Sequence, residues 1–130
     1  MNHRLLLCAL AMAAAALAAN QAATLFFTMG AVRGLLVGDG RVPGWAGLQA
    51  GENGLDPLTA DAALTGKGLG GFEELLSACV ALGATVMVCE MGLKAVGIAP
   101  SQLRPDVPVT TGGLVTFLTE ASRSGSMVFV

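Results

Sequence analysis

The sequence predicts a three-layer α/β domain with a mainly parallel sheet. Helical and strand-like segments alternate along the chain, and glycine or proline bounds most of the apolar, strand-like runs. The chain has 130 residues, which is enough for one buried core and too few for two. We therefore treat residues 1–130 as one domain.

The predicted elements follow one another in a regular order. Helices are expected at residues 5–20, 31–37, 72–82, 90–97 and 114–121, and strands at residues 22–28, 84–88, 107–110 and 126–130. This order begins on a helix, whereas a domain of this class normally opens with a strand. Two explanations are open: the first strand is absent, or the given sequence starts at an internal point of the domain.

Residues 38–71 are rich in glycine, proline and aspartate, which predicts a long loop excursion outside the sheet. Trp45 and Leu48 are the side chains expected to anchor it. Loops of this length often cover a site or a partner surface.

The composition excludes one class of partner and favours another. The net charge is −2 and the chain has no cluster of lysine and arginine, so a nucleic acid is not expected to bind. Hydrophobic residues make up 54% of the chain and charged residues 12%. So little polar surface predicts a homo-oligomer or contact with a membrane.

Three cysteines, Cys8, Cys79 and Cys89, leave an odd thiol, and none has zinc-ligand spacing with His3, the only histidine. No disulfide framework, metal site or cofactor is predicted. The glycines at 38–40 follow a helix, whereas a dinucleotide-binding loop follows a strand. The cysteine pattern indicates a reducing compartment.

Cys89 is the strongest candidate for a functional residue. It ends the apolar run 84–88 and precedes the helix expected from Glu90 onward. In a parallel sheet this is the carboxyl edge, where α/β domains bind their ligands and where helical N–H groups favour a thiolate. Cys89 is therefore expected to be a nucleophilic or sulfur-carrying thiol, with a buried structural cysteine as the alternative. Cys79 and Cys8 are expected to fill core space.

Few other groups could take part in catalysis. His3 lies in a terminal stretch that is expected to be mobile, so a cysteine–histidine pair is not predicted. A thiol that accepts and releases sulfur needs no base of its own. Gly112 and Gly113 follow a strand and should meet Cys89 and Gly30 at one edge, where backbone N–H groups could bind a small anion. Simple helix capping explains the glycine pair equally well.

The first residues allow three interpretations. Arg4 followed by an apolar, alanine-rich run to residue 19 is typical of a secretory signal, and the absence of charge up to Arg33 also permits a membrane helix. A buried helix followed by the strand at 22–28 is the third, and we favour it because helix and strand are continuous. No stable membrane span is then expected.

Two segments carry a resemblance to a known family. The resemblance is to the DsrE/DsrF-like family, and it lies in residues 23–30, which include Phe-Phe-Thr, and residues 83–98, which contain Cys89. The order of these segments, followed by the helix-strand unit that begins at Gly112-Gly113, also resembles that family. The resemblance implies a compact parallel-sheet α/β fold, association into trimers or hexamers, and a persulfide-carrying cysteine at Cys89 that relays sulfur between donor and acceptor proteins. Gly30, Glu90, Gly92, Gly112 and Gly113 would line this site.

The chain departs from the family pattern at two places. Gly92 stands where many relatives have a serine, and the strand that opens the family fold has no counterpart before Leu5. The resemblance makes a cytoplasmic sulfur-relay protein the leading hypothesis. A non-enzymatic binding or assembly module with a structural Cys89 is the alternative, and an exported protein is a third if residues 1–19 are a signal peptide.

Overall fold

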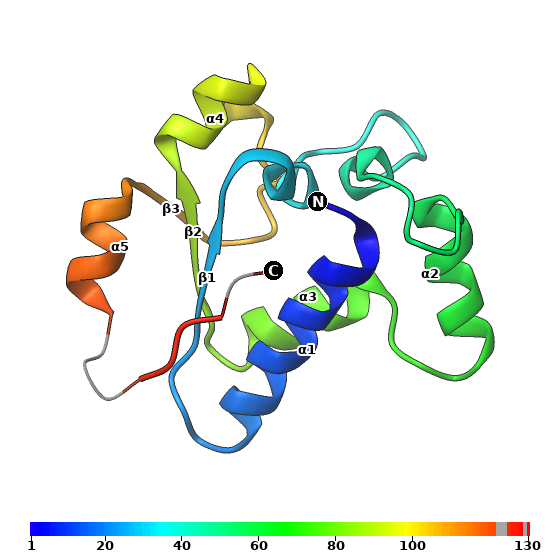
Figure 1. Cartoon of the computed structure of the whole chain (residues 1–130), viewed down its shortest axis with the longest axis horizontal. Coiled ribbons are helices and arrows are strands. Elements are labelled where there is room, and N and C mark those ends of the chain that lie inside the picture. Colours follow the sequence, from blue (N-terminus) through cyan, green and yellow to red (C-terminus); the bar gives the residue numbers. More distant parts are fainter. Residues whose placement is uncertain (122–124, 129) are drawn as a thin grey trace.

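The computed structural model describes residues 1–121, 125–128 and 130, and the chain folds around a parallel sheet. The strands are β1 (Thr24–Phe27), β2 (Thr85–Cys89) and β3 (Val109–Gly112), in the spatial order β1-β2-β3. Both pairings are parallel, so all three strands end at the same edge. Figure 1 shows helices on both sides of this sheet, which confirms the predicted α/β class.

Strand β3 begins two residues later than the sequence predicted, at Val109 in place of Val107. Pro108 has no N–H to donate to a sheet ladder, so regular pairing starts after it. Val107 is nevertheless buried and joins the hydrophobic core. The predicted last strand includes residue 129, which lies outside the described residues, and residues 126–128 have no strand conformation.

One face of the sheet carries the main hydrophobic core, together with α1 (His3–Ala18) and α3 (Phe72–Ala81). Asn2 caps α1, because its side-chain oxygen accepts a hydrogen bond from the backbone N–H of Leu5 at 2.9 Å. Leu6, Leu10 and Ala13 lie three or four residues apart and are all buried on one stripe of α1. The alanine-rich segment is thus a core helix, as the third interpretation predicted.

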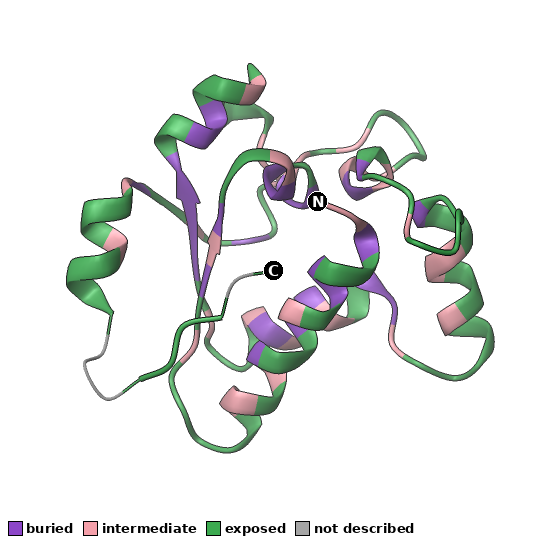
Figure 2. Ribbon diagram, viewed as in Figure 1, coloured by how far each residue is buried: buried purple, intermediate pink, exposed green. Residues whose placement is uncertain are grey.

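The main core combines these helix residues with alternate residues of the strands. Its strand members are Leu25, Phe27, Val86 and Val88, and its helix members include Leu10, Phe72, Leu76 and Cys79. Figure 2 shows the buried residues concentrated between the sheet and these two helices. Each fully buried large apolar side chain contributes about 1.5–3 kcal/mol relative to an exposed one.

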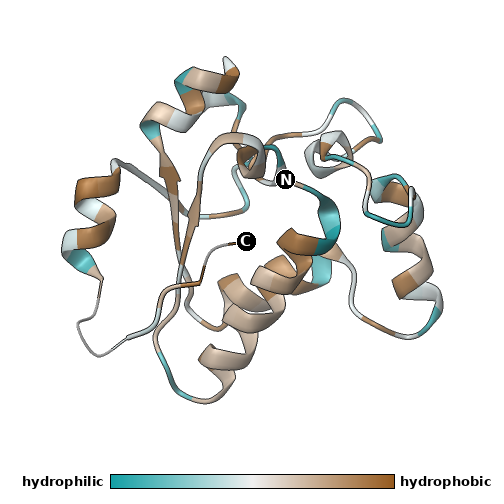
Figure 3. Ribbon diagram, viewed as in Figure 1, coloured by the Kyte–Doolittle hydropathy of each residue, from teal (hydrophilic) through white to brown (hydrophobic). Residues whose placement is uncertain are grey.

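The other face of the sheet has a thinner cover. Helix α5 (Leu114–Glu120) lies there, across the sheet from α1 and α3 (Figure 1). Phe117 of α5 stacks on Phe26 of β1, with ring centroids 4.5 Å apart and ring planes 15° apart. No residue of α5 is fully buried, and Figure 3 shows strongly hydrophobic residues along this exposed helix.

The carboxyl edge of the sheet is bordered by α4 (Glu90–Val96) and by the 3₁₀ helix η1 (Met29–Leu35). Helix α4 ends as predicted at Gly97, whose φ of +71° is a left-handed conformation that suits glycine. The segment predicted as a helix at 31–37 is helical, but it is the tighter 3₁₀ form and starts earlier. A Cβ atom on Gly34 of η1 would come within 2.8 Å of Leu6 and 3.1 Å of Phe72, so a larger residue has no room there.

The excursion at residues 38–71 is more ordered than the predicted loop. It contains a second 3₁₀ helix, η2 (Gly44–Gly47), and the ten-residue helix α2 (Pro57–Gly66). A third 3₁₀ helix, η3 (Pro100–Gln102), lies outside the excursion and precedes β3. Pro57 is the only buried residue of α2, so the sequence shows no amphipathic stripe there from which a helix could be predicted. The predicted anchors are confirmed, because Trp45 and Leu48 are both buried.

The N-terminal segment is fixed in place, so the expectation of a mobile His3 was wrong. His3 is 1% exposed, and its Nε2 lies 2.9 Å from Oδ1 of Asp61 on α2. Its ring also packs against the rings of Trp45 and Phe72, at centroid distances of 5.4 and 6.3 Å. No local sequence pattern indicates this contact, because Asp61 lies 58 residues further along the chain.

None of the helices in the described part of the chain has the length and apolar character needed to cross a lipid bilayer.

Replacing Leu10 by alanine should lower the free energy of unfolding by about 3 kcal/mol, because it removes buried methyl groups and leaves a cavity between α1 and α3. Met12→Ala on the same helix is the matched control. Met12 is 52% exposed, so its replacement should change stability by less than about 0.5 kcal/mol. Urea denaturation of both variants measures the difference, and equal stabilities would contradict a core role for α1.

Candidate functional site

Cys89 lies at the carboxyl end of the central strand of the sheet. It is the last residue of β2 and directly precedes Glu90, the first residue of α4. β1 and β3 flank β2 on its two sides, and Cys89 pairs in register with Gly112, the last residue of β3. The sequence therefore located this residue correctly at the turn from strand to helix.

The side chain of Cys89 faces away from the main core. Side chains alternate between the two faces of a strand, so Met87 and Cys89 share one face and Val86 and Val88 share the other. Val86 and Val88 belong to the main core cluster; Met87 and Cys89 are buried but do not belong to it. Cys89 is consequently on the α5 face, beside Met87.

Three of the glycines predicted to line the site, Gly112, Gly113 and Gly30, have different surroundings. Gly112 is opposite Cys89, and a side chain there would meet Met87 and Thr116 of α5. Gly113 precedes α5, and within the described part of the chain nothing lies within 4 Å of a Cβ atom placed there. Gly30 lies at the same edge of the sheet within η1, but its free side faces Met1.

Helix α4 brings Glu90 and Gly92 to the same edge. Glu90 is exposed in its first turn, and Gly92 is buried. A Cβ atom on Gly92 would come within 2.8 Å of both the backbone nitrogen of Met29 and Oγ1 of Thr28. The absence of a serine at this position therefore has a steric reason, because α4 packs directly on the end of β1.

The other two cysteines differ from Cys89 and from each other. Cys79 is fully buried as expected; its Sγ–H donates to the carbonyl of Leu10 at 3.2 Å, and burial raises the pKa of its thiol. Cys8 was expected to be a core residue, which was wrong, because it is exposed. It falls on the outer side of α1, opposite the stripe that contains Leu6 and Leu10. All three thiols lie within the described residues and form no disulfide.

His3 is engaged elsewhere in the structure and does not act on Cys89 through any described contact. Its Nε2–H donates to Asp61, and its Nδ1 is buried and has no hydrogen-bond partner among the described residues. Asp61 also accepts from the backbone N–H of Phe72 at 2.7 Å. Through these two hydrogen bonds, Asp61 connects the excursion to His3 of α1 and to Phe72 of α3. Within the described residues, no three His, Cys, Asp or Glu side chains gather closely enough to hold a metal ion.

A polar cluster that the sequence analysis missed surrounds Arg104. Its guanidinium donates two hydrogen bonds to Glu73, at 2.9 and 2.6 Å, and two to Asp106, at 2.8 and 2.7 Å. Oε1 of Glu73 also accepts from the indole N–H of Trp45 at 2.9 Å. The cluster thus joins α3, the excursion and the approach to β3. The Arg-x-Asp sequence at 104–106 gave a local hint, but Glu73 is 31 residues away.

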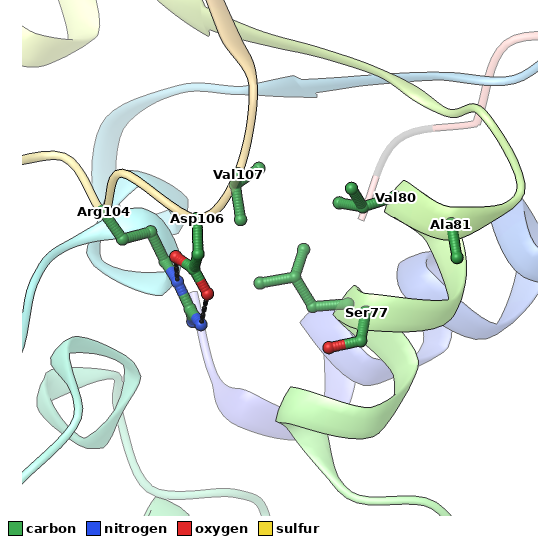
Figure 4. A pocket seen from close by; sticks show the side chains of 7 residues that line it. Ser77, Val80, Ala81, Arg104, Asp106 and Val107 are labelled. Carbon is green, nitrogen blue, oxygen red and sulfur yellow. Dashed lines mark hydrogen bonds and ion pairs between the residues drawn. The ribbon is translucent and has the colours of Figure 1, made fainter.

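Two shallow hollows lie on either side of Arg104, with volumes of about 180 and about 300 Å³. Figure 4 shows the smaller one, where Arg104 and Asp106 face Ser77 across the hollow. Each nitrogen of the Arg104 guanidinium already donates to a carboxylate. Cys89 lines neither hollow.

The fold and the position of the thiol together define a class of protein: a parallel-sheet α/β domain with a cysteine at the carboxyl edge, outside its main core. The model of the DsrE/DsrF-like family matches residues 7–129, nearly the whole chain. The chain belongs to the DsrE/DsrF-like family, as the resemblance indicated. No curated protein sequence matches it.

Acid should weaken the Arg104 cluster. Hydrogen bonds from Arg104 hold the pKa of Glu73 below its ordinary value of 4.5 and that of Asp106 below 3.8. A carboxyl group whose pKa is lowered by folding stabilises the protein above its ordinary pKa, and this stabilisation disappears as the pH falls through the lowered value. Both carboxylates are largely exposed, so solvent screening keeps the effect small.

Thermal melting measured from about pH 7 to about pH 3 tests this coupling. The melting temperature should decrease once the pH is lowered past about 4.5. Arg104→Gln should make this decrease smaller, because both carboxyl groups then return toward their ordinary pKa values. Lys94→Gln, a change at an exposed residue of α4, is the charge-matched control. An equally steep decline in the wild type and in Arg104→Gln would contradict the coupling.

Proposed function

We propose that this chain is a sulfur-relay protein in which Cys89 accepts sulfane sulfur as a persulfide and passes it to a partner protein. The observation that carries the proposal is the position of Cys89 at the carboxyl edge and outside the main core, in a member of the DsrE/DsrF-like family. A cysteine needed only for packing would be expected in the main core, where Cys79 lies.

The proposed transfer needs only thiol chemistry. The Cys89 thiolate attacks the outer sulfur of a donor persulfide, R–S–SH, and forms a new S–S bond. The S–S bond of the donor breaks, its electron pair leaves with R–S⁻, and the proton of the persulfide remains on the transferred sulfur or passes to solvent. A second attack by an acceptor thiolate on that sulfur regenerates the Cys89 thiolate. Neither step needs an external oxidant or reductant.

Few groups compete with Cys89 for this role. Burial raises the pKa of the Cys79 thiol, and its Sγ–H donates a hydrogen bond to the carbonyl of Leu10. Cys79 is therefore a poor nucleophile. Cys8 is exposed, but it lies on α1, which covers the opposite face of the sheet from α5.

In this proposal the backbone N–H groups at Glu90, Gly112 and Gly113 help to bind the transferred sulfur. Gly92 allows α4 to approach β1, and Gly30 belongs to the same edge.

We also propose that the chain acts as one domain within a homo-oligomer, a trimer or a hexamer. Apolar side chains remain exposed on several elements of the described chain, among them Leu5 on α1, Leu58 on α2 and Met91 on α4. Met91 is 69% exposed, the largest exposed fraction among these three. Apolar surface of this kind is normally buried in an interface. Sedimentation velocity should therefore report a trimer or hexamer, and a monomer at all concentrations would contradict it.

The free thiols and the folded α1 support a reducing compartment, the cytoplasm, as the place of action. Removal of residues 1–19 would take away the core residues Leu6, Leu7 and Leu10 together with the buried His3. Export with cleavage of a signal peptide is the competing possibility. The intact mass of the protein from its native host distinguishes the two, because cleavage shortens the chain.

Incubation with a sulfane-sulfur donor, followed by intact mass measurement and peptide mapping, tests the relay. One added sulfur should map to Cys89, and Cys89→Ser should abolish loading. The experiment is best done in a Cys8→Ser background, because an exposed thiol can be persulfidated without any functional site. Cys79→Ser is the matched control and should load normally.

Loading that is equal at all three thiols, or that persists in Cys89→Ser, would contradict the proposal. The second candidate would then be a binding or assembly module with a structural Cys89. One observation favours that alternative: Cys89 is only 4% exposed. In such a module Cys89→Ala would slightly change stability and leave partner binding intact.

A further inference from the structure

A buried thiol cannot exchange sulfur with another protein until something moves. Cys89 is 4% exposed, and it does not line either of the two hollows beside Arg104. The proposed transfer requires a second sulfur atom to reach bonding distance of its Sγ. The element that covers Cys89 therefore decides whether the site can work. The purpose of uncovering Cys89 rests on the proposed sulfur relay, whereas the movement itself can be tested without it.

Helix α5 is the described helix on the face where Cys89 lies. It begins two residues after Gly112, the residue that pairs with Cys89. Thr116 in its first turn lies near Gly112, and Met87, which shares the face with Cys89, lies there too. Movement of α5 away from the sheet would thus uncover the row formed by Met87 and Cys89.

The attachment of α5 is weak compared with that of α1 and α3. None of its residues is fully buried, and its ring contact with the sheet is the stack of Phe117 on Phe26. Leu114, Val115 and Leu118 point away into solvent, at 55%, 79% and 56% exposure. Elements with so little buried apolar surface open at a low free energy, well before the whole domain unfolds.

The connection to the sheet also permits movement. Gly112 and Gly113 join β3 to α5, and glycine has the widest choice of backbone conformations. Gly113 adopts φ −95° and ψ 173°, an ordinary extended conformation, and a Cβ atom there would contact none of the described residues. The pair can serve as a hinge whose stiffness can be changed without disturbing the closed state.

We propose that α5 is a hinged cover over Cys89, held closed by the Phe117–Phe26 stack and opening about Gly112-Gly113 to admit a sulfur donor or acceptor. Opening makes Cys89 reactive while the main core, on the other face of the sheet, stays folded. The cover gives the relay a closed state in which its thiol is protected from non-specific reaction.

The three cysteines form a set of internal probes for this proposal. N-ethylmaleimide is added to the native protein, and the rate of labelling at each thiol is followed by peptide mapping. Cys8 is exposed and reports the intrinsic rate, whereas Cys79, fully buried in the main core, reports global unfolding. Cys89 should be labelled more slowly than Cys8 and faster than Cys79. A Cys89 rate equal to either of the other two would overturn the proposal.

Two variants change the cover in opposite directions. Phe117→Ala removes the stack and should raise the ratio of the Cys89 rate to the Cys79 rate by about tenfold or more, because labelling follows the population of the open state. Gly113→Ala restricts the hinge and should lower the same ratio. Leu118→Ala changes an exposed side chain of the same helix and is the matched control, with an unchanged ratio.

A variant that is simply less stable cannot imitate the result expected for Phe117→Ala, because easier global unfolding raises the Cys79 rate and thereby lowers the ratio. For Gly113→Ala the Cys89 rate itself must fall, which a loss of stability would not produce. A ratio unchanged in Phe117→Ala and in Gly113→Ala would overturn the hinged cover. Maleimide labelling involves no sulfur transfer, so this result is independent of the persulfide experiment. A cover that opens as proposed, in a protein that never carries sulfur at Cys89, would disprove the relay alone.

Discussion

The structure depends on the central position of strand β2, which is paired in parallel with β1 on one side and with β3 on the other. Because its side chains alternate, this one strand supplies two different layers. Val86 and Val88 enter the main core, and Met87 and Cys89 face α5. A shift of its register by one residue would exchange the two sets and place the thiol among the leucines of α1 and α3. The pairing of β2 therefore fixes both the core and the candidate site.

The two faces of the sheet are covered very unequally, and this asymmetry suits a division of roles. Helices α1 and α3 pack on one face with fully buried residues such as Leu10 and Phe72, which supply most of the apolar burial. On the other face, seven residues of α5 are attached chiefly through one aromatic stack. Stability can thus be concentrated on the first face while the second stays free to move, as is common for elements that border functional sites.

The excursion at residues 38–71 is held to the domain by polar contacts in addition to its buried anchors. Trp45 packs against Phe72 and donates to Glu73, and Asp61 accepts from both His3 and the backbone of Phe72. Both sets of contacts converge on the first residues of α3. The start of α3 is thereby the common anchor of α1, the excursion and, through Arg104, the approach to β3.

The sequence by itself determined the α/β class, the family resemblance and the place of Cys89, since these depend on short-range features. Apolar periodicity, glycine at helix ends and the turn from strand to helix are all visible within a window of a few residues. Helix α2 was missed because it buries almost nothing and so has no such pattern. The helix at η1 was predicted, but its 3₁₀ form was not, because that form differs from an α-helix in its hydrogen bonding. Tertiary structure alone decided the burial of His3, the exposure of Cys8 and the Arg104 cluster, because each depends on contacts between residues far apart in the chain or on which side of a helix meets the core. For the same reason only the fold could place Cys89 on the thinly covered face, where the packing of α5 controls access to its sulfur.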